Sequence, residues 1–413
     1  MLFIFLEVQE FTLIIAQSPW PSETWDAAVN LTQVMNTEGL TNLSGLHWNP
    51  DLNRLYIVDD NGSIRVLEQN ASNSTFAEIA NIPIEGGPED ITQVNYRTDE
   101  FYTIDENNYE IRKYTYTANF SSLLLAKSWN LLKSPSPMNK TGNTGPEGIA
   151  FVPDNFLIAA GFISQSSGQL YTSKKGMGGL LFIAHQDEGY IWVFDVNPSL
   201  NNDFAYVGKY KTNKEESCDL EFDRSTGLLY ILHNIENNTL EITDLKSTLK
   251  GNDQKFNIIK EYSIANPTDN INLEGFALSP KCPNSDNVSV WLCRDVESTE
   301  SQSIQNECIK WFNPYIADGN CNLNSINPII KENKFQINVF PNPASHSIKI
   351  SISYLNLKNA SIRVIDSQGR ITIEKERISG GDYLLDISNL NKGLYLIEIY
   401  QENYFSTIKW LKN

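Results

Sequence analysis

The sequence predicts an all-β protein in two parts, a five- or six-bladed β-propeller followed by a small antiparallel β-sandwich of immunoglobulin-like type. Two observations lead to this fold class. A five-residue motif, clearest as Glu-Gly-Ile-Ala-Phe at 147–151, recurs imperfectly along most of the chain, and each copy is followed by a similar pair of strand-like runs. Repeats built only of strands are typical of propeller blades, none of which can bury its faces alone. Beyond residue 334 the repeats give way to seven short strand-like runs.

The composition is that of a folded, acidic protein. A chain of 413 residues exceeds what one core usually supports, and 41% hydrophobic residues provide enough apolar material for two domains. The net charge is −18 and no Lys/Arg cluster interrupts it. This charge argues against nucleic-acid binding, which needs phosphate neutralisation, and favours partners that are cations.

Residues 1–17 are predicted to be the remnant of a signal peptide cleaved near Ala16. Apolar runs occupy 1–6 and 11–16, but the first basic residue is Arg54, so the basic start of a secretory signal is absent. The runs are too short and interrupted to span a bilayer, and no transmembrane segment is expected. A packed N-terminal strand is the alternative.

The five cysteines suit an exported protein. Four lie within 282–321, where three disulfide pairings are possible and the sequence cannot choose between them, while Cys218 stands apart. No Cys-x-x-Cys pair occurs, which argues against a zinc ribbon or a thioredoxin-like site. The other four are Cys282, Cys293, Cys308 and Cys321.

The propeller is predicted over 18–318, with five countable units. Within the third unit, 156–178 is an insertion, either a loop over one face of the disc or part of a sixth blade, and its apolar start at 156–160 is predicted to be a strand. The segment 25–31 is predicted to be a strand that joins the last blade and closes the ring. The motif copies begin at Ser44, Glu89, Glu147, Cys218 and Glu274.

Three glutamates at the first motif position, Glu89, Glu147 and Glu274, suggest a metal site. Equivalent positions of a propeller lie around one ring, so these side chains are expected to converge on the axis. Carboxylates in a narrow tunnel repel one another unless a hard cation lies between them. Oxygen ligands favour Ca²⁺, and Mg²⁺ is less favoured because it demands tighter geometry.

A second candidate set lies at the end of the second strand of each unit. Histidine there is expected to accept a proton and Arg294 to bind an oxyanion or phosphate, with an anionic or acyl substrate held between them. The alternative is structural, since such residues often cap turns or bond neighbouring blades. The set is Asp59, Asp105, His185, His233 and Arg294.

At these residues the chain resembles the phytase-like and SdiA-regulated propellers, over about 40–315. The resemblance implies five or six blades, Ca²⁺ binding and, in some relatives, hydrolysis of phosphomonoesters or esters. Ser44 and Cys218 replace the acid in two units, and no dense Lys/Arg set for a highly phosphorylated substrate occurs. We therefore expect a secreted Ca²⁺-dependent hydrolase of a small ester or phosphoester, an esterase, lactonase or phosphatase. The alternative is a noncatalytic surface propeller that binds a ligand or protein through the disc face and the insertion.

The segment 319–334 is predicted to be a linker and 335–413 a seven-stranded sandwich. Its strands are expected at 335–340, 347–354, 360–366, 371–375, 383–387, 394–400 and 405–410. The motifs Val-Phe-Pro-Asn-Pro-Ala at 339–344, Val-Ile-Asp-Ser-Gln-Gly-Arg at 364–370 and Leu-Asn-Lys-Gly-Leu-Tyr at 390–395 resemble the type A sorting domain of the type IX secretion system of Bacteroidota. The resemblance implies passage through the periplasm, contact with the type IX machinery, and a secreted or outer-surface location.

Overall fold

The computed structural model describes residues 17–35, 40–234, 238–250, 253–264, 271–282, 286–321, 336–353, 360–366, 371–378, 381–401 and 404–413. The predicted signal-peptide remnant therefore lies, but for Gln17, outside the described residues. The chain separates into two compact units, 1–326 and 327–413, and each is described by itself.

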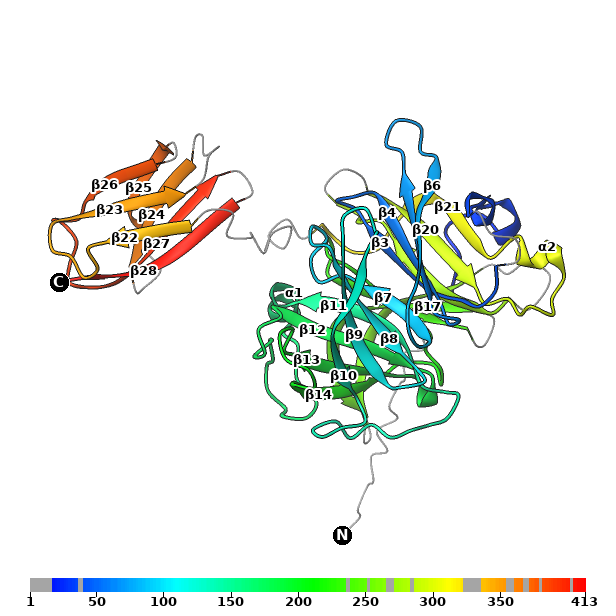
Figure 1. The fold of residues 1–413 in the computed structure, drawn as a ribbon. Coiled ribbons are helices and arrows are strands. Elements are labelled where there is room, and N and C mark those ends of the chain that lie inside the picture. The colour runs from blue at the N-terminus through cyan, green and yellow to red at the C-terminus, as the bar shows by residue number, and fades with distance from the viewer. Residues whose placement is uncertain are drawn as a thin grey trace, which may run out of the picture. The chain divides into compact units, whose positions relative to one another are not determined.

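The first unit consists of five blades, each with four antiparallel strands, and two of the blades are joined into one larger sheet (Figure 1). In blades 1 to 4 neighbouring strands are consecutive in the sequence, and in blade 3 the first two are joined by the insertion 154–178. Blade 1 holds β3 (Leu43–Asn49), β4 (Arg54–Asp59), β5 (Ser63–Gln69) and β6 (Phe76–Pro83). Blade 2 holds β7 (Pro88–Thr92), β8 (Glu100–Asp105), β9 (Glu110–Tyr116) and β10 (Leu123–Asn130). Blade 3 holds β11 (Pro146–Pro153), β12 (Gly179–His185), β13 (Tyr190–Val196) and β14 (Phe204–Lys211).

Blade 4 holds β15 (Asp219–Asp223), β16 (Leu228–His233), β17 (Thr239–Lys250) and β18 (Asp253–Ser263), and a single parallel pairing of Lys211 with Lys255 links it to blade 3. Blade 5 holds β19 (Leu273–Leu278), β20 (Asn287–Arg294) and β21 (Ile309–Ile316), and its fourth strand is β2 (Val29–Asn30). The inner strands contact one another in the closed cycle β3, β7, β11, β15, β19 and back to β3. The unit is therefore a five-bladed propeller.

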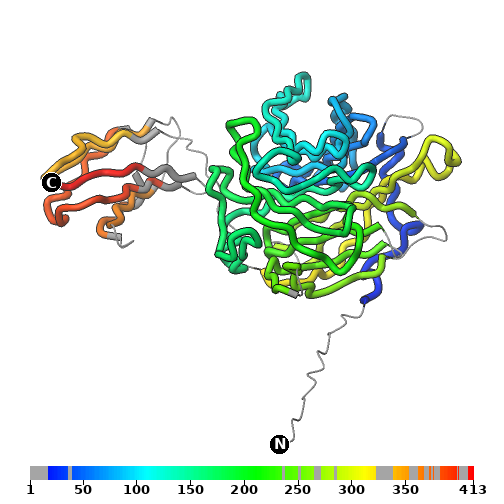
Figure 2. The backbone as a smooth tube through the Cα atoms, turned by 90° about the horizontal axis from the view of Figure 1, so that it is seen from below, coloured from blue at the N-terminus to red at the C-terminus, as the bar shows by residue number. Residues whose placement is uncertain are grey.

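The ring is closed by the N-terminal segment, as the sequence predicts, although only two residues form the strand. Val29 pairs with Trp311 and Asn30 with Lys310, and Figure 2 shows this N-terminal segment beside the end of blade 5. The preceding Trp25–Ala27 is a 3₁₀ helix, η1, with Trp25 buried. A second 3₁₀ helix, η2 (Thr32–Val34), follows, and β1 (Ser18–Pro19) pairs with the outer strand of blade 4.

The apolar run at 156–160 is a helix, so the strand predicted there is wrong. The helix α1 (Asp154–Ala160) has Asp154 in its first turn and ends at Gly161, which adopts the left-handed conformation with φ 67°. It buries Phe156 and Leu157. A short apolar run has no periodicity that separates a buried strand from a helical turn, which is why the sequence misleads here. The remaining short helices are η3 (Asp187–Gly189) and α2 (Gln302–Gln305).

Close packing at the axis explains the glycines of the motif. At its second position the five blades carry three glycines and two aspartates. A Cβ on Gly45 would lie 2.5 Å from Cα of Asp90, and one on Gly148 would lie 2.8 Å from Cα of Asp219. No side chain fits at such separations, so glycine is needed where a neighbouring strand carries aspartate.

One disulfide joins Cys282 to Cys321, and Cys218, Cys293 and Cys308 are free and buried. The bond ties the loop between β19 and β20 to the segment that follows β21. Pairing all four clustered cysteines would give two disulfides, whereas the structure has one and leaves Cys293 and Cys308 unpaired.

The second unit is a two-sheet β-sandwich with the seven strands that the sequence predicts. One sheet has the order β22–β23–β26 and the other β25–β24–β27–β28, with a shared core that includes Ile350, Val364, Ile397 and Trp410. The strands are β22 (Gln336–Phe340), β23 (Ser347–Ser353), β24 (Ala360–Asp366), β25 (Ile371–Ile378), β26 (Gly381–Asp386), β27 (Gly393–Gln401) and β28 (Tyr404–Lys412).

The Pro-Asn-Pro motif of this unit anchors its last strand. Asn342 accepts a hydrogen bond from the backbone N–H of Leu411 (3.0 Å), and the Trp410 indole N–H donates to the carbonyl of Pro341 (3.2 Å). Ala344 N–H donates to the carbonyl of Leu411 (3.2 Å). These bonds satisfy main-chain groups on the free edge of β28, which would otherwise be open to pairing with another chain.

Candidate functional site

The propeller contains an acidic pocket where the inner strands begin. Its volume is about 170 Å³, and it is lined from four of the five blades. Among the described residues, six carboxyl side chains line it and no Lys, Arg or His does, and the remaining lining is largely amide and hydroxyl. The carboxyls belong to Asp60, Glu89, Glu106, Glu147, Glu274 and Asp295, and the other lining residues are Asn42, Leu43, Ser44, Asn143 and Gln186.

All three glutamates predicted as metal ligands line this pocket, but they are held differently. Glu89 accepts a hydrogen bond from the Ser44 hydroxyl (2.6 Å). Glu274 accepts from the side-chain amides of Asn272 (2.6 Å) and Asn234 (3.1 Å). Glu147 is only 6% exposed and, within the described residues, takes part in no hydrogen bond or ion pair. Glu147 is thus a buried carboxyl that faces the pocket without a partner.

Burial and mutual repulsion make these carboxyls weak acids. Burial raises the pKa of Glu89 to about 8, and the nearby carboxylate of Asp60 adds to the rise. Burial is the main cause that raises the pKa of Glu274 to about 8, and the charge of Asp295 is the second cause. The pKa of Glu147 lies well above its usual range because of burial and then the charges of Glu89 and Glu274. Burial and mutual repulsion therefore disfavour the simultaneous ionisation of these carboxyls.

The sequence argument does not select three of the six carboxyls, Asp60, Glu106 and Asp295, because it selects the residue one position before each of them. Each follows directly the residue that we align at the end of the second strand. In blade 3 the following residue, Gln186, also lines the pocket, and in blade 4 the following Asn234 donates to Glu274. Successive side chains of a strand point to opposite sides, so a register error of one residue selects the side chains that point away from the pocket.

The five residues predicted as catalytic accordingly do not meet at the pocket, and none of them lines it. Asp59 accepts a hydrogen bond from the Ser63 hydroxyl within its own blade. Asp105 forms an ion pair with Arg112 (2.6 Å) and accepts from the N–H of Asn108 (2.8 Å). Both aspartates therefore hold the turn that follows their strand, which is the structural alternative.

The two histidines and the arginine also make local contacts. His185 Nδ1 accepts a hydrogen bond from the N–H of Asp187 (3.1 Å), and burial lowers the pKa of His185 to about 4. His233 is fully buried, with Nδ1 against the carbonyl of Glu216 and Nε2 3.6 Å from Glu241. Arg294 donates to the carbonyl of Ile304 (2.8 Å) and lies over the ring of Trp25. The structure does not assemble these residues into a substrate site.

The axis below the pocket is filled with buried polar groups. Asp90 and Asp219 are 1% and 0% exposed. Burial raises the pKa of both, and the charge of Asp219 adds to the rise at Asp90. Further along, His47 Nδ1 lies 3.2 Å from the Glu221 carboxyl. Burial lowers the pKa of His47 to about 3 and raises that of Glu221, so burial disfavours the charged form of each group.

Arg224 lies over the ring of Tyr96 (4.1 Å) and donates to the carbonyls of Val94 (3.0 Å) and Gln93, beyond the ends of the inner strands away from the pocket. Its charge contributes to the lowered pKa of His47. These contacts fill the axis on the side away from the pocket.

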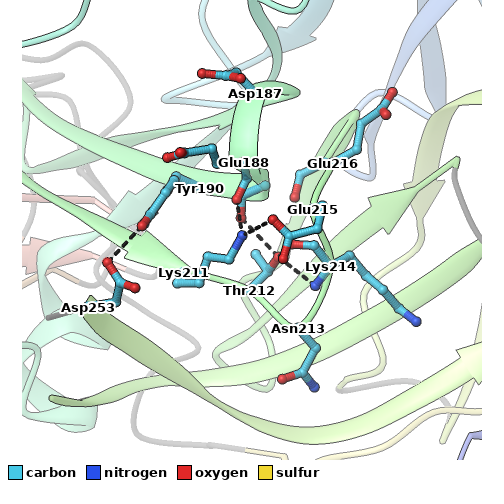
Figure 3. A network of polar contacts seen from close by, with 12 residues as sticks. Asp187, Glu188, Tyr190, Lys211, Thr212, Asn213, Lys214, Glu215, Glu216 and Asp253 are labelled. Carbon is cyan, nitrogen blue, oxygen red and sulfur yellow. Dashed lines mark hydrogen bonds and ion pairs between the residues drawn. The ribbon is translucent and has the colours of Figure 1, made fainter. Parts of the chain in front are cut away.

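The chain between blades 3 and 4 adds negative charge beside the pocket. Figure 3 shows this segment: Lys211 pairs with Glu215 (2.9 Å) and donates to the carbonyl of Glu188, and the Thr212 hydroxyl donates to the carbonyl of Gly189 (2.9 Å). Glu216, which follows in the same segment, is among the charges that raise the pKa of Glu147. Anchoring by Lys211 and Thr212 thus keeps a further carboxyl near the site.

The donor chemistry of the pocket fits Ca²⁺. Every polar lining side chain offers oxygen, which Ca²⁺ prefers in sets of six to eight, and the absence of lining His or Cys argues against zinc. As placed, however, no three His, Cys, Asp or Glu side chains of the described residues converge as ligands of one ion. The carboxyls would have to turn toward an ion, and Glu147, which has no bond to break, is the freest to do so.

The fold and pocket define the protein as an acidic β-propeller carrying a separate β-sandwich tail. Residues 338–413 match the family model described as "Secretion system C-terminal sorting domain", and residues 23–161 match the model described as "SdiA-regulated". The first match thus covers nearly the whole of the sandwich, whose sorting role in the type IX system implies secretion or an outer-surface location, and the second covers the first part of the propeller. No helix among the described residues is long and apolar enough to cross a membrane.

No curated protein matches the chain. Among solved structures it is similar to Raptor of Chaetomium thermophilum, with 11% identity and a TM-score of 0.34, over 94% of this chain and 29% of Raptor. It is also similar to a putative 6-phosphogluconolactonase of Bacteroides uniformis, with 10% identity and a TM-score of 0.33, over 64% of this chain and 87% of that protein.

Proposed function

We propose that this exported propeller binds a divalent cation, Ca²⁺ foremost, in its axial pocket and takes its ligand or substrate there. The observation that supports this most strongly is Glu147, a carboxyl that is 6% exposed, lines the pocket and has no hydrogen-bond partner among the described residues. A buried carboxyl is costly unless it is protonated, paired or bound to a metal. Bound Ca²⁺ would neutralise carboxylates and offer a coordination site to an oxygen-bearing ligand.

The same pocket narrows the range of ligands. With six carboxyls and no basic side chain in its lining, it repels a free phosphate or carboxylate ligand. The segment 156–178 contributes nothing to the lining, because it follows the end of β11 opposite to Glu147. A ligand site formed jointly by the pocket and this insertion is therefore not part of the proposal.

Hydrolysis of a small ester, or of a phosphoester whose charge bound Ca²⁺ would offset, is the second candidate. It is favoured by the raised pKa of Glu89 and Glu274, about 8 for each, which leaves protonated carboxyls at the pocket at neutral pH. Such groups can donate a proton to a leaving oxygen. Because His185 and His233 do not line the pocket, this candidate depends on the carboxyls.

The test is calorimetric titration of the metal-stripped full chain with CaCl₂, with Glu147→Gln as the diagnostic variant and Glu188→Gln, outside the pocket, as the control. We expect binding by the wild type and the control, and at least about tenfold weaker binding by Glu147→Gln. Absence of binding by the wild type would refute the proposal. An ester, lactone and phosphoester panel, with and without chelator, then separates a hydrolase from a binding protein.

A further inference from the structure

Two carboxyl groups on the axis connect the strands that carry the three pocket glutamates. Asp90, next to Glu89 in β7, accepts hydrogen bonds from the N–H of Ile91 and, in the next blade, from the N–H of Ile149 (2.6 Å each). Ile149 lies two residues after Glu147 in β11. One carboxylate thereby ties the main chain around Glu89 to that around Glu147.

Asp219 makes the equivalent connection between blades 4 and 5. It accepts from the N–H of Leu220 in its own strand and from the N–H of Phe276 in β19, two residues after Glu274. The Asp219 carboxyl is among the charges that raise the pKa of Asp90, so the two connections lie near each other at the axis.

The glycines of the motif make this arrangement possible. Gly45 and Gly148 leave the space in which the main chains of Asp90 and Asp219 approach the neighbouring blades, at separations that no side chain allows. Neither aspartate lines the pocket, so a direct role in holding a ligand is excluded by position.

We infer that Asp90 and Asp219 are positioning residues, which set the separation of Glu89, Glu147 and Glu274 by fixing the main chain of the three strands that carry them. The consequence for cation binding rests on the proposed function, but the positioning itself does not. Ligand separation governs selection between Ca²⁺ and the smaller Mg²⁺. The pair therefore acts on selectivity as well as on affinity.

The experiment uses the full chain with Asp219→Ala, and Asp195→Ala as the matched control. Asp195 is equally buried, at 0% exposure, and accepts four hydrogen bonds, from the hydroxyls of Tyr171 and Ser173 and the N–H groups of Lys174 and Lys175, away from the pocket. Both variants lose a buried acceptor, so a general loss of stability is common to them.

Two quantities are measured: amide hydrogen exchange of β19, and the affinities for Ca²⁺ and Mg²⁺. We expect faster exchange of the Phe276 amide and at least about a tenfold drop in the ratio of Ca²⁺ to Mg²⁺ affinity for Asp219→Ala, with neither change for Asp195→Ala. If Asp219→Ala does not fold, Asp219→Asn, which loses only one of the two acceptor oxygens, is measured instead and should change both quantities in the same direction.

Unchanged exchange of β19 in the Asp219 variant would overturn the inference. If the wild type binds Ca²⁺, an equal ratio of Ca²⁺ to Mg²⁺ affinity in the variant and the wild type would also overturn it. A wild type that binds no Ca²⁺ refutes the proposed function alone, and β19 exchange then decides on the positioning role by itself.

Discussion

At the scale of single residues, Glu147 is the side chain whose energetics depend most on a cation. Its pKa is raised in the fold, so the unfolded chain releases this proton at lower pH than the native chain. The native state then binds more protons, and stability falls as pH rises above the usual glutamate pKa of about 4.5. The carboxyl is destabilising at neutral pH unless an ion compensates.

We therefore expect Glu147→Gln to stabilise the metal-free propeller at pH 8, by roughly 1 kcal/mol or more, since one pKa unit is worth about 1.4 kcal/mol. The difference should vanish near pH 4, where the glutamate is protonated in both states. Saturating Ca²⁺ should reverse the sign at pH 8. Urea unfolding at both pH values, with EDTA or Ca²⁺, measures this, and a metal-free variant less stable than the wild type at pH 8 would contradict it.

The residue scale also shows how far the sequence argument reaches. The first motif position identifies Glu89, Glu147 and Glu274 because the bulged start of each inner strand is marked by glycine or aspartate. The second set fails because strand ends are not marked in the sequence. A shift of one residue exchanges Asp59 and Asp105, which hold turns, for Asp60 and Glu106, which face the pocket.

Among the elements, the two-residue strand β2 and the residues that follow it bond to blade 5 through more than the strand pairing. The Thr32 hydroxyl accepts hydrogen bonds from two buried amides of blade 5, those of Cys308 (2.9 Å) and Ile309 (3.1 Å). The N–H of Leu31 donates to the carbonyl of Ile309 (3.1 Å). Side-chain and main-chain bonds thus supplement a strand of two residues.

Replacing Thr32 by valine keeps the shape but leaves both amides without an acceptor. We expect a loss of about 2–4 kcal/mol in the free energy of unfolding of the propeller, because an unsatisfied buried donor costs about 1–3 kcal/mol. The control is Thr299→Val at an exposed position, which should change little. Equal urea midpoints for the two variants would show that the closing segment does not depend on this side chain.

The sequence predicts whether a segment is a strand or a helix where the same pattern recurs in several blades, but not where a segment occurs once. Each blade strand appears several times in the same setting, and the closing strand follows from the need to cover a sheet edge. Helix α1 occurs once, in an apolar run of five residues, and its local signals are Asp154 in the first turn and the cap at Gly161. The blade number became definite only when α1 proved not to be a strand.

For the whole molecule, the main feature is the division of the chain into two compact units. The propeller core, its closing strand and the disulfide at Cys321 all lie before the sorting domain. The sorting domain has a core of its own, centred on Trp410.

A chain ending at Cys321 should therefore fold and form its disulfide but remain in the periplasm of a cell that has the type IX system. Immunoblots of the periplasm, cell surface and medium compare it with the full chain. Equal amounts of the two proteins outside the cell would contradict a sorting role for 338–413.

The pairing of Val29 with Trp311 has a consequence for timing. The ribosome makes Val29 nearly three hundred residues before Trp311. The propeller ring therefore cannot close, and an open seam with an unpaired sheet edge remains, while the first four blades are synthesised. Contacts this distant in sequence form slowly, and open seams attract other chains. Any factor that delays Trp311 prolongs the period in which the nascent protein is vulnerable to misassembly.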